Sequence, residues 1–345
     1  MDAEPSCSGR RVGSRLARGW FFVAVLAVAC ATAGPAWASF PGTNGTIVYA
    51  WTSANKYVPS PTSIRAVDPR GGSVRTLRDC PLITDRAPFP YIDCSVYTPR
   101  YSPDGSRIAF SAAHFDYPPG GGQQYTPGLG LMASDGTGLD ERATAQSTFR
   151  LAWSPAGDRL LVDHLVPGGP TDAGAIFLAS LDGTELRQVT SQYTGAPDWS
   201  STGRIAFVRS DPACAFGCSN IFVTRLGGKP RRLTHRGGFS PSWSPHGTKL
   251  AFVRLGRSRR DDDPADVYVV RRDGSGLRRL TRRGGYAPAW SPDGRWIAFM
   301  RAGDLYVVRA TGGHLRRLVD ELGPDETYSL GPQVLTVDWQ ALPTP

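Results

Sequence analysis

The sequence predicts an all-β fold, a six-bladed β-propeller built from four-stranded antiparallel blades. Three observations predict it: a short motif recurs along the chain, turn-forming residues separate short apolar segments, and the two ends of the chain complement each other. Gly and Pro make up 69 of the 345 residues, and Trp, Tyr and Phe contribute 35. This composition is typical of many short strands joined by tight turns, and it excludes a helical bundle or a disordered chain.

The recurring motif is an aromatic residue followed by Ser-Pro-x-Gly and then by an apolar segment such as Ile-Ala-Phe. The aromatic positions that define the repeat are Tyr101, Trp153, Trp199, Trp243, Trp290 and Trp339. They are 52, 46, 44, 47 and 49 residues apart. A period in this range is typical of one four-stranded propeller blade.

Each repeat is expected to divide into four strands in a fixed order. The first strand ends at the aromatic residue, and Ser-Pro-x-Gly then forms a tight turn, because Pro fixes its own φ and Gly accepts a positive φ. The second strand is the Ile-Ala-Phe segment, as at 297–299. A third strand such as 267–270 is joined through Asp273-Gly274, a hairpin signal, to a fourth strand of the type Leu-Arg-Arg-Leu-Thr at 277–281.

The two ends of the chain supply the parts of one further blade. Residues 44–50 have the pattern of a second strand with no first strand before it, and residues 337–339 have that of a first strand with nothing after it. Joined, they complete a sixth blade, so we expect the C-terminal strand to close the ring onto the first blade. Such closure removes the exposed edges that an open sheet leaves.

The first 38 residues have the layout of a secretory signal peptide. A basic region precedes an apolar run at 19–33, and Ala36-Trp37-Ala38 is a small-x-small cleavage site. We expect cleavage after Ala38, which leaves residues 39–345 as a single propeller domain that is exported to the periplasm, the cell envelope or the medium. The alternatives are an uncleaved anchor, a twin-arginine signal and lipidation of Cys30. No later segment is long and apolar enough to span a membrane.

Four cysteines remain after cleavage, and an even number in an exported chain suggests two disulfides. Sequence proximity favours the pairs Cys80 with Cys94 and Cys214 with Cys218 among the three possible connectivities. A bond between the first two closes a loop of roughly 15 residues, which contributes about 3 kcal/mol in the chain-entropy model. A metal site is disfavoured, because the spacing contains no Cys-x-x-Cys and no nearby histidine.

The Trp-Ser-Pro-Asp-Gly turn at 290–294, the Ile-Ala-Phe strand and the Arg-Arg-Leu-Thr strand resemble the units of TolB-like β-propellers, which are WD-repeat-like. The segments 40–45 and 338–343 are similar to the first and last residues of exported bacterial members. The resemblance covers about 44–343, and its motif is specific for the fold rather than for a function. The member that names the family has a separate N-terminal domain, and no segment of that kind lies between Ser39 and the first strand.

One face of the predicted ring is uniform and the other is variable. Connections from the first to the second strand, and from the third to the fourth, are short Gly-containing turns throughout. Connections from the second to the third strand differ in length, and the long segments 79–95 and 319–333 belong to the same face. Functional residues usually lie on loops that a rigid scaffold holds. We therefore expect a monomeric, non-enzymatic module that binds an envelope or extracellular protein, or an anionic polymer, through the variable face.

Candidate catalytic residues are few, and no Gly-x-Ser-x-Gly motif is present. His114, Asp163 and His164 follow second strands and, with Asp116, form the one plausible acid–base or metal-binding group of the variable rim. An ordinary polar loop is the favoured interpretation of these residues. The alternative function is a metal-assisted lyase or hydrolase acting on an anionic polysaccharide. This function requires the side chains of these residues to converge on one site.

Two further groups of charged residues are candidates for function. Asp261, Asp262 and Asp263 are candidate calcium ligands, because Ca²⁺ binds carboxylate oxygens. The spacing is not that of an EF-hand and arginines precede the run, so a solvated loop is favoured and no cofactor is expected. The residue just before the recurring aromatic residue differs from blade to blade. If the first strands line a central channel, Arg100, Asp198 and Asp338 occupy this position and would make the channel polar.

Arginine pairs recur at 231–232, 278–279, 282–283 and 316–317, in a chain of net charge +9. Such pairs suggest an anionic partner. Most of them fall on a predicted outermost strand, where charge blocks edge-to-edge aggregation, and edge protection is the favoured interpretation. Export argues against nucleic acid as the physiological target.

Overall fold

The computed structural model divides the chain into two compact units, Met1–Gly34 and Pro35–Pro345, and the second contains every residue whose structure is described. The described residues are 40–51, 63–80, 82–83, 91–92, 94–116, 124–144, 148–165, 174–191, 193–210, 219–256, 265–320 and 336–343. The predicted signal peptide, residues 1–38, lies outside them. No helix among the described residues is long and apolar enough to cross a membrane.

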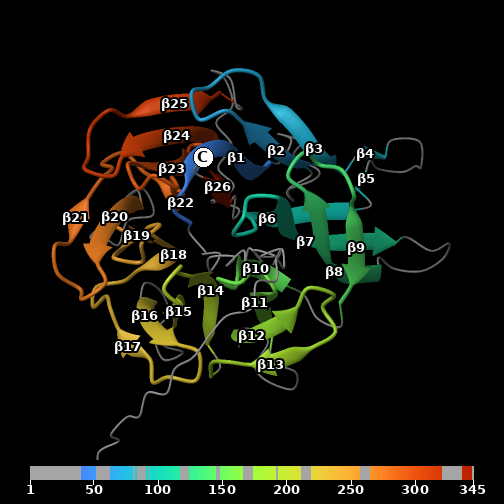
Figure 1. The fold of residues 1–345 in the computed structure, drawn as a ribbon, viewed down its shortest axis with the longest axis horizontal. Helices are drawn as coiled ribbons and strands as arrows, with labels where there is room; N and C mark the ends of the chain where they lie inside the picture. Colours follow the sequence, from blue (N-terminus) through green and yellow to red (C-terminus); the bar gives the residue numbers. More distant parts are fainter. Residues whose placement is uncertain are drawn as a thin grey trace, which may run out of the picture. The chain divides into compact units, whose positions relative to one another are not determined.

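The unit Pro35–Pro345 forms six four-stranded antiparallel sheets, the blades, arranged around a centre (Figure 1). This confirms the predicted fold class. Blade 1 uses both ends of the chain, and its strands from the centre outward are β26 (Val337–Leu342), β1 (Thr43–Trp51), β2 (Ser63–Val67) and β3 (Arg75–Asp79). A separate short hairpin, β4 (Leu82–Ile83) and β5 (Tyr91–Ile92), follows it in sequence.

Blades 2 to 6 each follow the chain from the innermost to the outermost strand. Blade 2 contains β6 (Cys94–Tyr101), β7 (Arg107–Asp116), β8 (Gln124–Ala133) and β9 (Asp140–Ala143). Blade 3 contains β10 (Thr148–Trp153), β11 (Arg159–Leu165), β12 (Gly174–Ser180) and β13 (Leu186–Gln188). Blade 4 contains β14 (Thr194–Trp199), β15 (Arg204–Arg209), β16 (Asn220–Arg225) and β17 (Arg231–Arg232).

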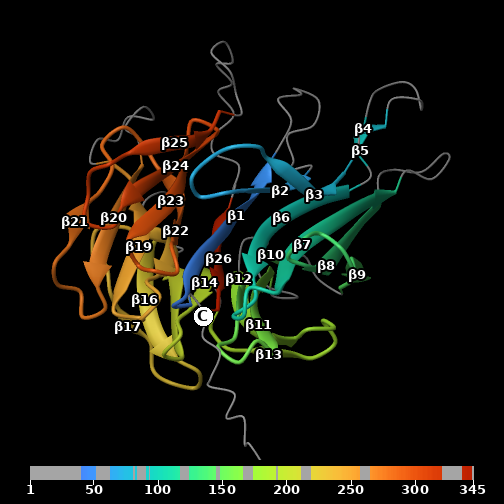
Figure 2. The same ribbon diagram turned by 45° about the horizontal axis from the view of Figure 1, so that its top comes forward.

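The last two blades repeat this order with similar lengths. Blade 5 contains β18 (Phe239–Trp243), β19 (Lys249–Arg254), β20 (Asp266–Arg271) and β21 (Arg278–Arg279). Blade 6 contains β22 (Tyr286–Trp290), β23 (Trp296–Arg301), β24 (Asp304–Arg309) and β25 (Arg316–Val319). In the turned view the β4–β5 hairpin lies toward one side of the ring, and the C-terminal end of β26 lies toward the other (Figure 2).

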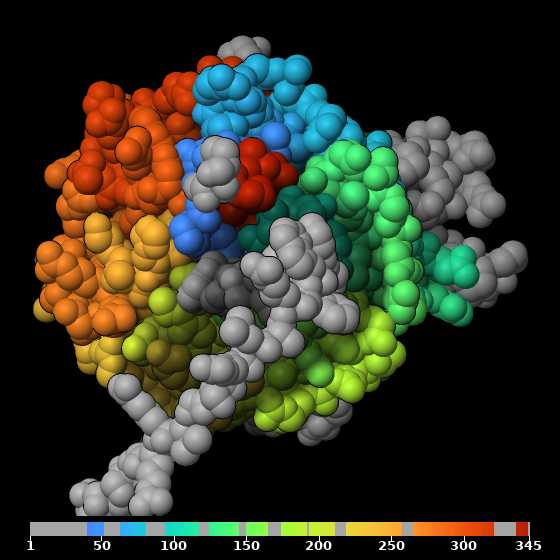
Figure 3. Space-filling view, viewed as in Figure 1, coloured from blue at the N-terminus to red at the C-terminus, as the bar shows by residue number. Residues whose placement is uncertain are grey.

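The ring closes as predicted, because β26 pairs with β1 in an antiparallel register that places Trp339 opposite Ile47. The first and last strands, blue and red, lie side by side near the centre of the space-filling view (Figure 3). The indole Nε1 of Trp339 also donates a hydrogen bond of 3.1 Å to the carbonyl oxygen of Gly45. The two ends of the chain are therefore held by sheet pairing and by side-chain contact.

The Ser-Pro-x-Gly motif forms the tight turn from first to second strand. In blade 2 the Gly105 amide donates to the Ser102 carbonyl at 2.8 Å, and Gly105 has a φ of 70°, which favours glycine. The Ser102 hydroxyl accepts from the Arg107 amide at 2.9 Å and donates to Asp104 at 2.6 Å. The serine thus satisfies polar groups of the turn, and this explains its recurrence at nearly every blade.

The recurring aromatic residue packs between its own blade and the blade before it. Trp243 of blade 5 shares a core cluster with Ala206 and Ile221 of blade 4, and Trp290 of blade 6 shares one with Ala251 of blade 5. The same arrangement holds for Tyr101, Trp153, Trp199 and Trp339. The structure thus supports blade-to-blade packing, rather than a stacking platform for a ligand, as the role of this position.

The Arg-Arg-Leu-Thr segment lies on the outermost strand, as predicted, and also links blades. Its threonine accepts from the amide of the third strand, as Thr281 Oγ1 does from Val267 at 3.0 Å. Its first arginine reaches the turn of the next blade: Arg231 donates to the carbonyl of Arg272 at 2.6 Å, and Arg316 to that of Pro69 at 2.6 Å. These arginines therefore join neighbouring blades in addition to carrying charge at a sheet edge.

Candidate functional site

The innermost strands share a β-bulge that sets the positions of the central residues. In blades 2, 4, 5 and 6 the residue before a proline takes a positive φ, between 46° and 50°, at Thr98, Ala196, Ser240 and Ala287. The strand register shifts at each of these places. A positive φ is costly for residues other than glycine, and bulges re-aim the side chains that follow. The residues that follow by two positions include Arg100 and Asp198.

The structure links two of the three predicted channel residues directly. Arg100 Nη1 donates to the Val337 carbonyl at 2.9 Å and lies 3.8 Å from Asp338 Oδ1. The other Asp338 oxygen accepts from the Tyr101 amide at 2.8 Å. Arg100 and Tyr101 belong to blade 2 and Asp338 to blade 1, so this cluster joins adjacent blades at the centre of the ring.

Asp198 joins blades 4 and 5 in a similar way, through a hydrogen bond to the backbone of the next blade. Its Oδ2 accepts from the Trp243 amide at 2.6 Å, and the residue is 8% exposed. Burial raises the pKa of Asp198 to about 6, while the positive charge of Arg100 opposes the rise. Burial also raises the pKa of Asp338, again against the effect of Arg100. The electrostatic coupling of Arg100 to both carboxyl groups makes the centre one polar cluster.

A second arginine, Arg150 of β10, belongs to the same region. Its side chain reaches Ser240 of blade 5 at 3.5 Å, past blade 4. Burial lowers the pKa of the Arg150 guanidinium, and the negative charge of Asp163 opposes this. Asp163 in turn accepts from the backbone amides of Arg150 at 2.6 Å and of Ala196 at 3.1 Å. The polar contacts described at the centre therefore link one blade to another.

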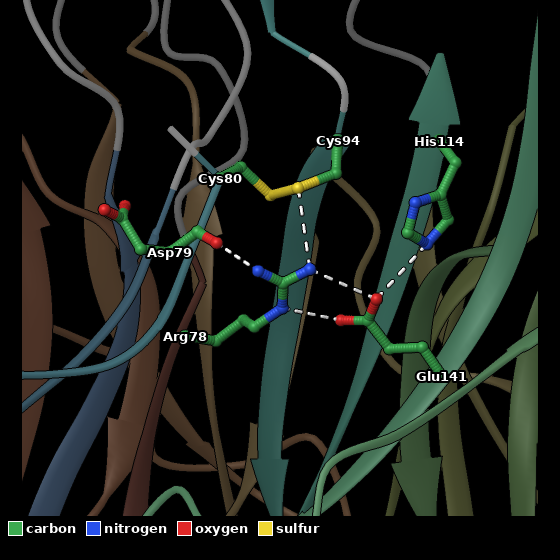
Figure 4. The surroundings of a disulfide bond; sticks show 6 residues. All are labelled: Arg78, Asp79, Cys80, Cys94, His114 and Glu141. Carbon is green, nitrogen blue, oxygen red and sulfur yellow. Dashed lines mark hydrogen bonds and ion pairs between the residues drawn. A yellow bond between two sulfur atoms is a disulfide. The ribbon is translucent and has the colours of Figure 1, made fainter. Parts of the chain in front are cut away.

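The predicted disulfide between Cys80 and Cys94 is confirmed and joins the end of β3 in blade 1 to β6 in blade 2 (Figure 4). Arg78 lies beside it, with Nη2 3.6 Å from the Cys94 sulfur. The Arg78 guanidinium binds Glu141 of β9 through hydrogen bonds of 2.8 and 3.2 Å. His114 Nε2 lies 3.2 Å from the same carboxylate. A covalent bond and an ion-pair cluster thus fix blade 1 to blade 2 at the base of 81–93.

The structure gives the candidate catalytic residues separate surroundings. His114 contacts Glu141 in blade 2, whereas Asp163 contacts backbone amides in blade 3. His164 is 2% exposed and packs edge-on against Phe177 with the ring centroids 5.5 Å apart. Asp163 and His164 are consecutive on β11, so their side chains point to opposite faces of the sheet. No described contact brings the three together as an acid–base group.

The remaining predicted groups lie outside the described residues. These are the second cysteine pair, Cys214 and Cys218, and the candidate calcium ligands Asp261, Asp262 and Asp263. Within the described part of the chain, no group of three or more His, Cys, Asp or Glu side chains is arranged to hold a metal ion.

Sequence reasoning missed Arg78, Glu141 and Arg150. Arg78 and Glu141 lie 63 residues apart, on the outermost strands of neighbouring blades, and no local pattern links them. Arg150 precedes the aromatic Trp153 by three residues, at the position that Thr98 and Ser240 occupy in their blades. Aligning the bulge positions of the repeat would have identified it as a central residue.

The fold and its central cluster define the class of protein: a six-bladed β-propeller whose blades are joined by polar contacts at the centre. No protein-family model and no curated protein matches the sequence. Among solved structures, it is similar to TolB from Acinetobacter baumannii, with a TM-score of 0.59 and 18% identity over 86% of this chain and 67% of that one. It is also similar to the tricorn protease, with a TM-score of 0.55 and 16% identity over 85% of this chain. The chain spans only 27% of the tricorn protease, and at these identities the similarity concerns the fold.

Proposed function

We propose that the chain is an exported, non-enzymatic propeller that binds an envelope or extracellular protein, or a polymer, through the variable face. One observation carries the proposal: connection lengths vary far more at this face than at the other. Two residues join β23 to β24, whereas eleven join β1 to β2. At the opposite face, the connections from β6, β10, β14, β18 and β22 to the following strand all have four or five residues. Variation concentrated on one face of a repetitive scaffold is typical of a binding surface.

The clamp between blades 1 and 2 supports the same proposal. The Cys80–Cys94 bond holds the base of 81–93, which belongs to the variable face, and the Arg78–Glu141 ion pair lies directly beside it. A loop held at its base loses less conformational entropy on binding than a free loop does. The disulfide also supports export, since such bonds persist in oxidising compartments.

A capture experiment with matched variants tests the proposal. The whole chain, produced with its disulfide intact, is immobilised and exposed to solubilised envelope and culture medium. In two loop variants a short Gly-Ser segment replaces 84–90 or 52–62, so that both cysteines stay in place. Arg159→Gln, at the start of β11 on the opposite face, is the control. We expect one loop variant to lose a ligand that the whole chain and the control both retain. Equal capture by all four proteins, or capture by none, would contradict the proposal.

A further inference from the structure

A group of cations lies on the uniform face of blades 4 and 5, opposite the variable face. We call it the basic face and define it as Arg204, Arg225, Arg231, Lys249, Arg271 and Arg272. Arg204 and Lys249 begin second strands, and Arg225 and Arg271 end third strands. Arg231 begins the outermost strand of blade 4, and Arg272 lies in the turn that follows β20. All of these strand ends meet at the same face. Blades 4 and 5 form the yellow to orange sector of Figure 3.

The strand register places like charges directly opposite each other at this face. Arg204 is paired with Arg225 across β15 and β16, and Lys249 with Arg271 across β19 and β20. Like charges in this arrangement destabilise a sheet. The equivalent residue of blade 3, Arg159, lies opposite Ser180 and forms an ion pair with Glu185. Folding alone therefore gives no reason for the pairs in blades 4 and 5.

Three guanidinium groups surround Arg204 closely enough to affect its ionisation. Partial burial lowers the pKa of Arg204, and the positive charges of Arg225, Arg272 and Arg231 lower it further. Arg204 Nε is buried and has no hydrogen-bond partner among the described residues. Arg225 is held by the Thr202 carbonyl at 3.1 Å, and this contact with a neutral group leaves its charge uncompensated.

Few carboxylates are available to neutralise this cluster. In the described part of blades 4 to 6, those at the uniform face are Asp273 and Asp293. Asp273 accepts from the amide and hydroxyl of Ser275, at 2.9 and 2.7 Å, in its own turn. The uniform face of blades 2 and 3 is different, because acidic residues accompany its arginines: Asp104, Asp135, Asp140, Asp158, Asp182 and Glu185. The ring is therefore strongly basic on one side of this face only.

Two exposed leucines accompany the cations, and the position of Leu277 is also an exposed leucine in blades 2, 3 and 6, at Leu139, Leu186 and Leu315. Leu226 is 40% exposed and follows Arg225 directly, and Leu277 is 49% exposed and precedes Arg278. Both lie in or beside the hairpin between the third and fourth strands. Exposed leucines next to unpaired cations are the combination that proteins use to bind membrane surfaces, where the apolar side chain enters the interface and the cation meets a phosphate.

We propose that the basic face docks on an anionic phospholipid surface, with its cations over the headgroup phosphates and Leu226 and Leu277 in the interfacial layer. A soluble polyanion offers phosphates or sulfates but no apolar layer, so it would leave Leu226 and Leu277 exposed to water. Docking in this way directs the variable face away from the bilayer. The proposal is independent of the proposed function, because the two concern opposite faces and different residues.

Vesicle flotation tests the proposal on the full chain. The vesicles contain phosphatidylglycerol and phosphatidylcholine, or phosphatidylcholine alone, and binding is measured at low and high salt. The basic-face variant is Arg225→Gln with Arg272→Gln, and the apolar variant is Leu226→Ser with Leu277→Ser. The control, Arg142→Gln with Arg187→Gln, makes the same change of charge on blades 2 and 3. Every protein has the same N-terminal residues, so any effect of these is common to all of them.

We expect the chain to bind the anionic vesicles and not the neutral ones, and to lose binding at high salt. Removal of one cation should weaken binding about fivefold, and the double basic-face variant roughly 25-fold, while the control stays near the unchanged chain. The apolar variant should bind vesicles more weakly and dextran sulfate, a soluble polyanion, unchanged. Equal loss in the basic-face variant and the control would overturn the proposal. So would equal binding to both kinds of vesicle, or binding to dextran sulfate alone.

Discussion

Asp198 is a carboxyl group held inside the ring where blade 4 meets blade 5. It accepts a hydrogen bond from the Trp243 amide, and burial raises its pKa to about 6, against about 3.9 for an exposed aspartate. The folded protein therefore binds this proton more tightly than the unfolded chain does. Consequently the contribution of Asp198 to stability is greatest below about pH 4 and declines as the pH rises to about 6.

Asp198→Asn should flatten this pH dependence. The asparagine stays neutral and its carbonyl still accepts from the Trp243 amide, so the variant avoids the cost of a buried charge. Above pH 6 its free energy of unfolding should exceed that of the unchanged chain by on the order of 2 kcal/mol, and the two should converge near pH 4. Asp338, whose pKa is also raised, leaves a residual slope of the same sign. Urea titrations from pH 4 to 7 measure the effect, and parallel curves for the two proteins would contradict it.

At the scale of residues, sequence reasoning located groups more reliably than it assigned their contacts. The position before the aromatic residue singled out Arg100, Asp198 and Asp338, and in the structure Arg100 and Asp338 lie in contact while Asp198 bonds to the Trp243 amide of the next blade. Asp163 was a candidate for the variable rim, with an ordinary polar loop as the favoured interpretation, and in the structure it accepts from the amides of Arg150 and Ala196. The contact with Ala196 crosses from blade 3 to blade 4, and no pattern within one repeat reveals it.

At the scale of elements, the clamp between blades 1 and 2 combines a disulfide with an ion-pair cluster. The bond has a sequence separation of 14 residues, close to the loop that the sequence suggested. Arg78 and Glu141 are 20% and 12% exposed at the side chain, so water screens their attraction less than that of a surface pair. The β4–β5 hairpin within this loop was not predicted, because strands of two residues leave no periodic pattern.

Replacing both cysteines, Cys80→Ala with Cys94→Ala, should lower the free energy of unfolding by about 3 kcal/mol. The cause is the greater conformational freedom of the unfolded chain once the loop is open. Guanidinium titrations with and without a reducing agent measure the change. The reducing agent should lower the free energy of unfolding of the unchanged chain by a similar amount. Any change that it causes in the stability of the double variant reports on Cys214 and Cys218. Equal stability of the variant and the oxidised chain would show that the bond adds nothing.

At the scale of the whole molecule, the sequence repeat determined most of what could be predicted. Blade number, strand order and closure all follow from one motif and its period, since each repeat must bury the same apolar positions against its neighbours. The basic face was not predicted, because Arg204 and Arg225 become neighbours only through the strand register. The paired arginines of the outermost strands were recognised, yet their contacts with the next blade required the geometry of the ring.

Removal of β26 should abolish cooperative folding of the ring, because this strand is shared by the two ends of the propeller. Trp339 is 6% exposed and packs with Ala289 and Ala298 of blade 6 and with Ile47 of blade 1. Truncation of a buried tryptophan alone costs about 3–5 kcal/mol, and loss of the strand also exposes the edge of β1. A chain ending at residue 335 should therefore unfold at much lower denaturant than the full chain does.

Hydrogen exchange separates this ring effect from a local one. Deletion of residues 336–345 should remove amide protection first in blade 1 and in β22, which flank the gap, and then around the ring. Deletion of residues 344–345 alone is the control and should leave protection unchanged. In a linear repeat array, loss of a terminal unit affects its neighbour most, whereas a closed ring loses the contact that joins its ends. Retention of full protection in blades 1 and 6 without β26 would show that the ring needs no closure to stay folded.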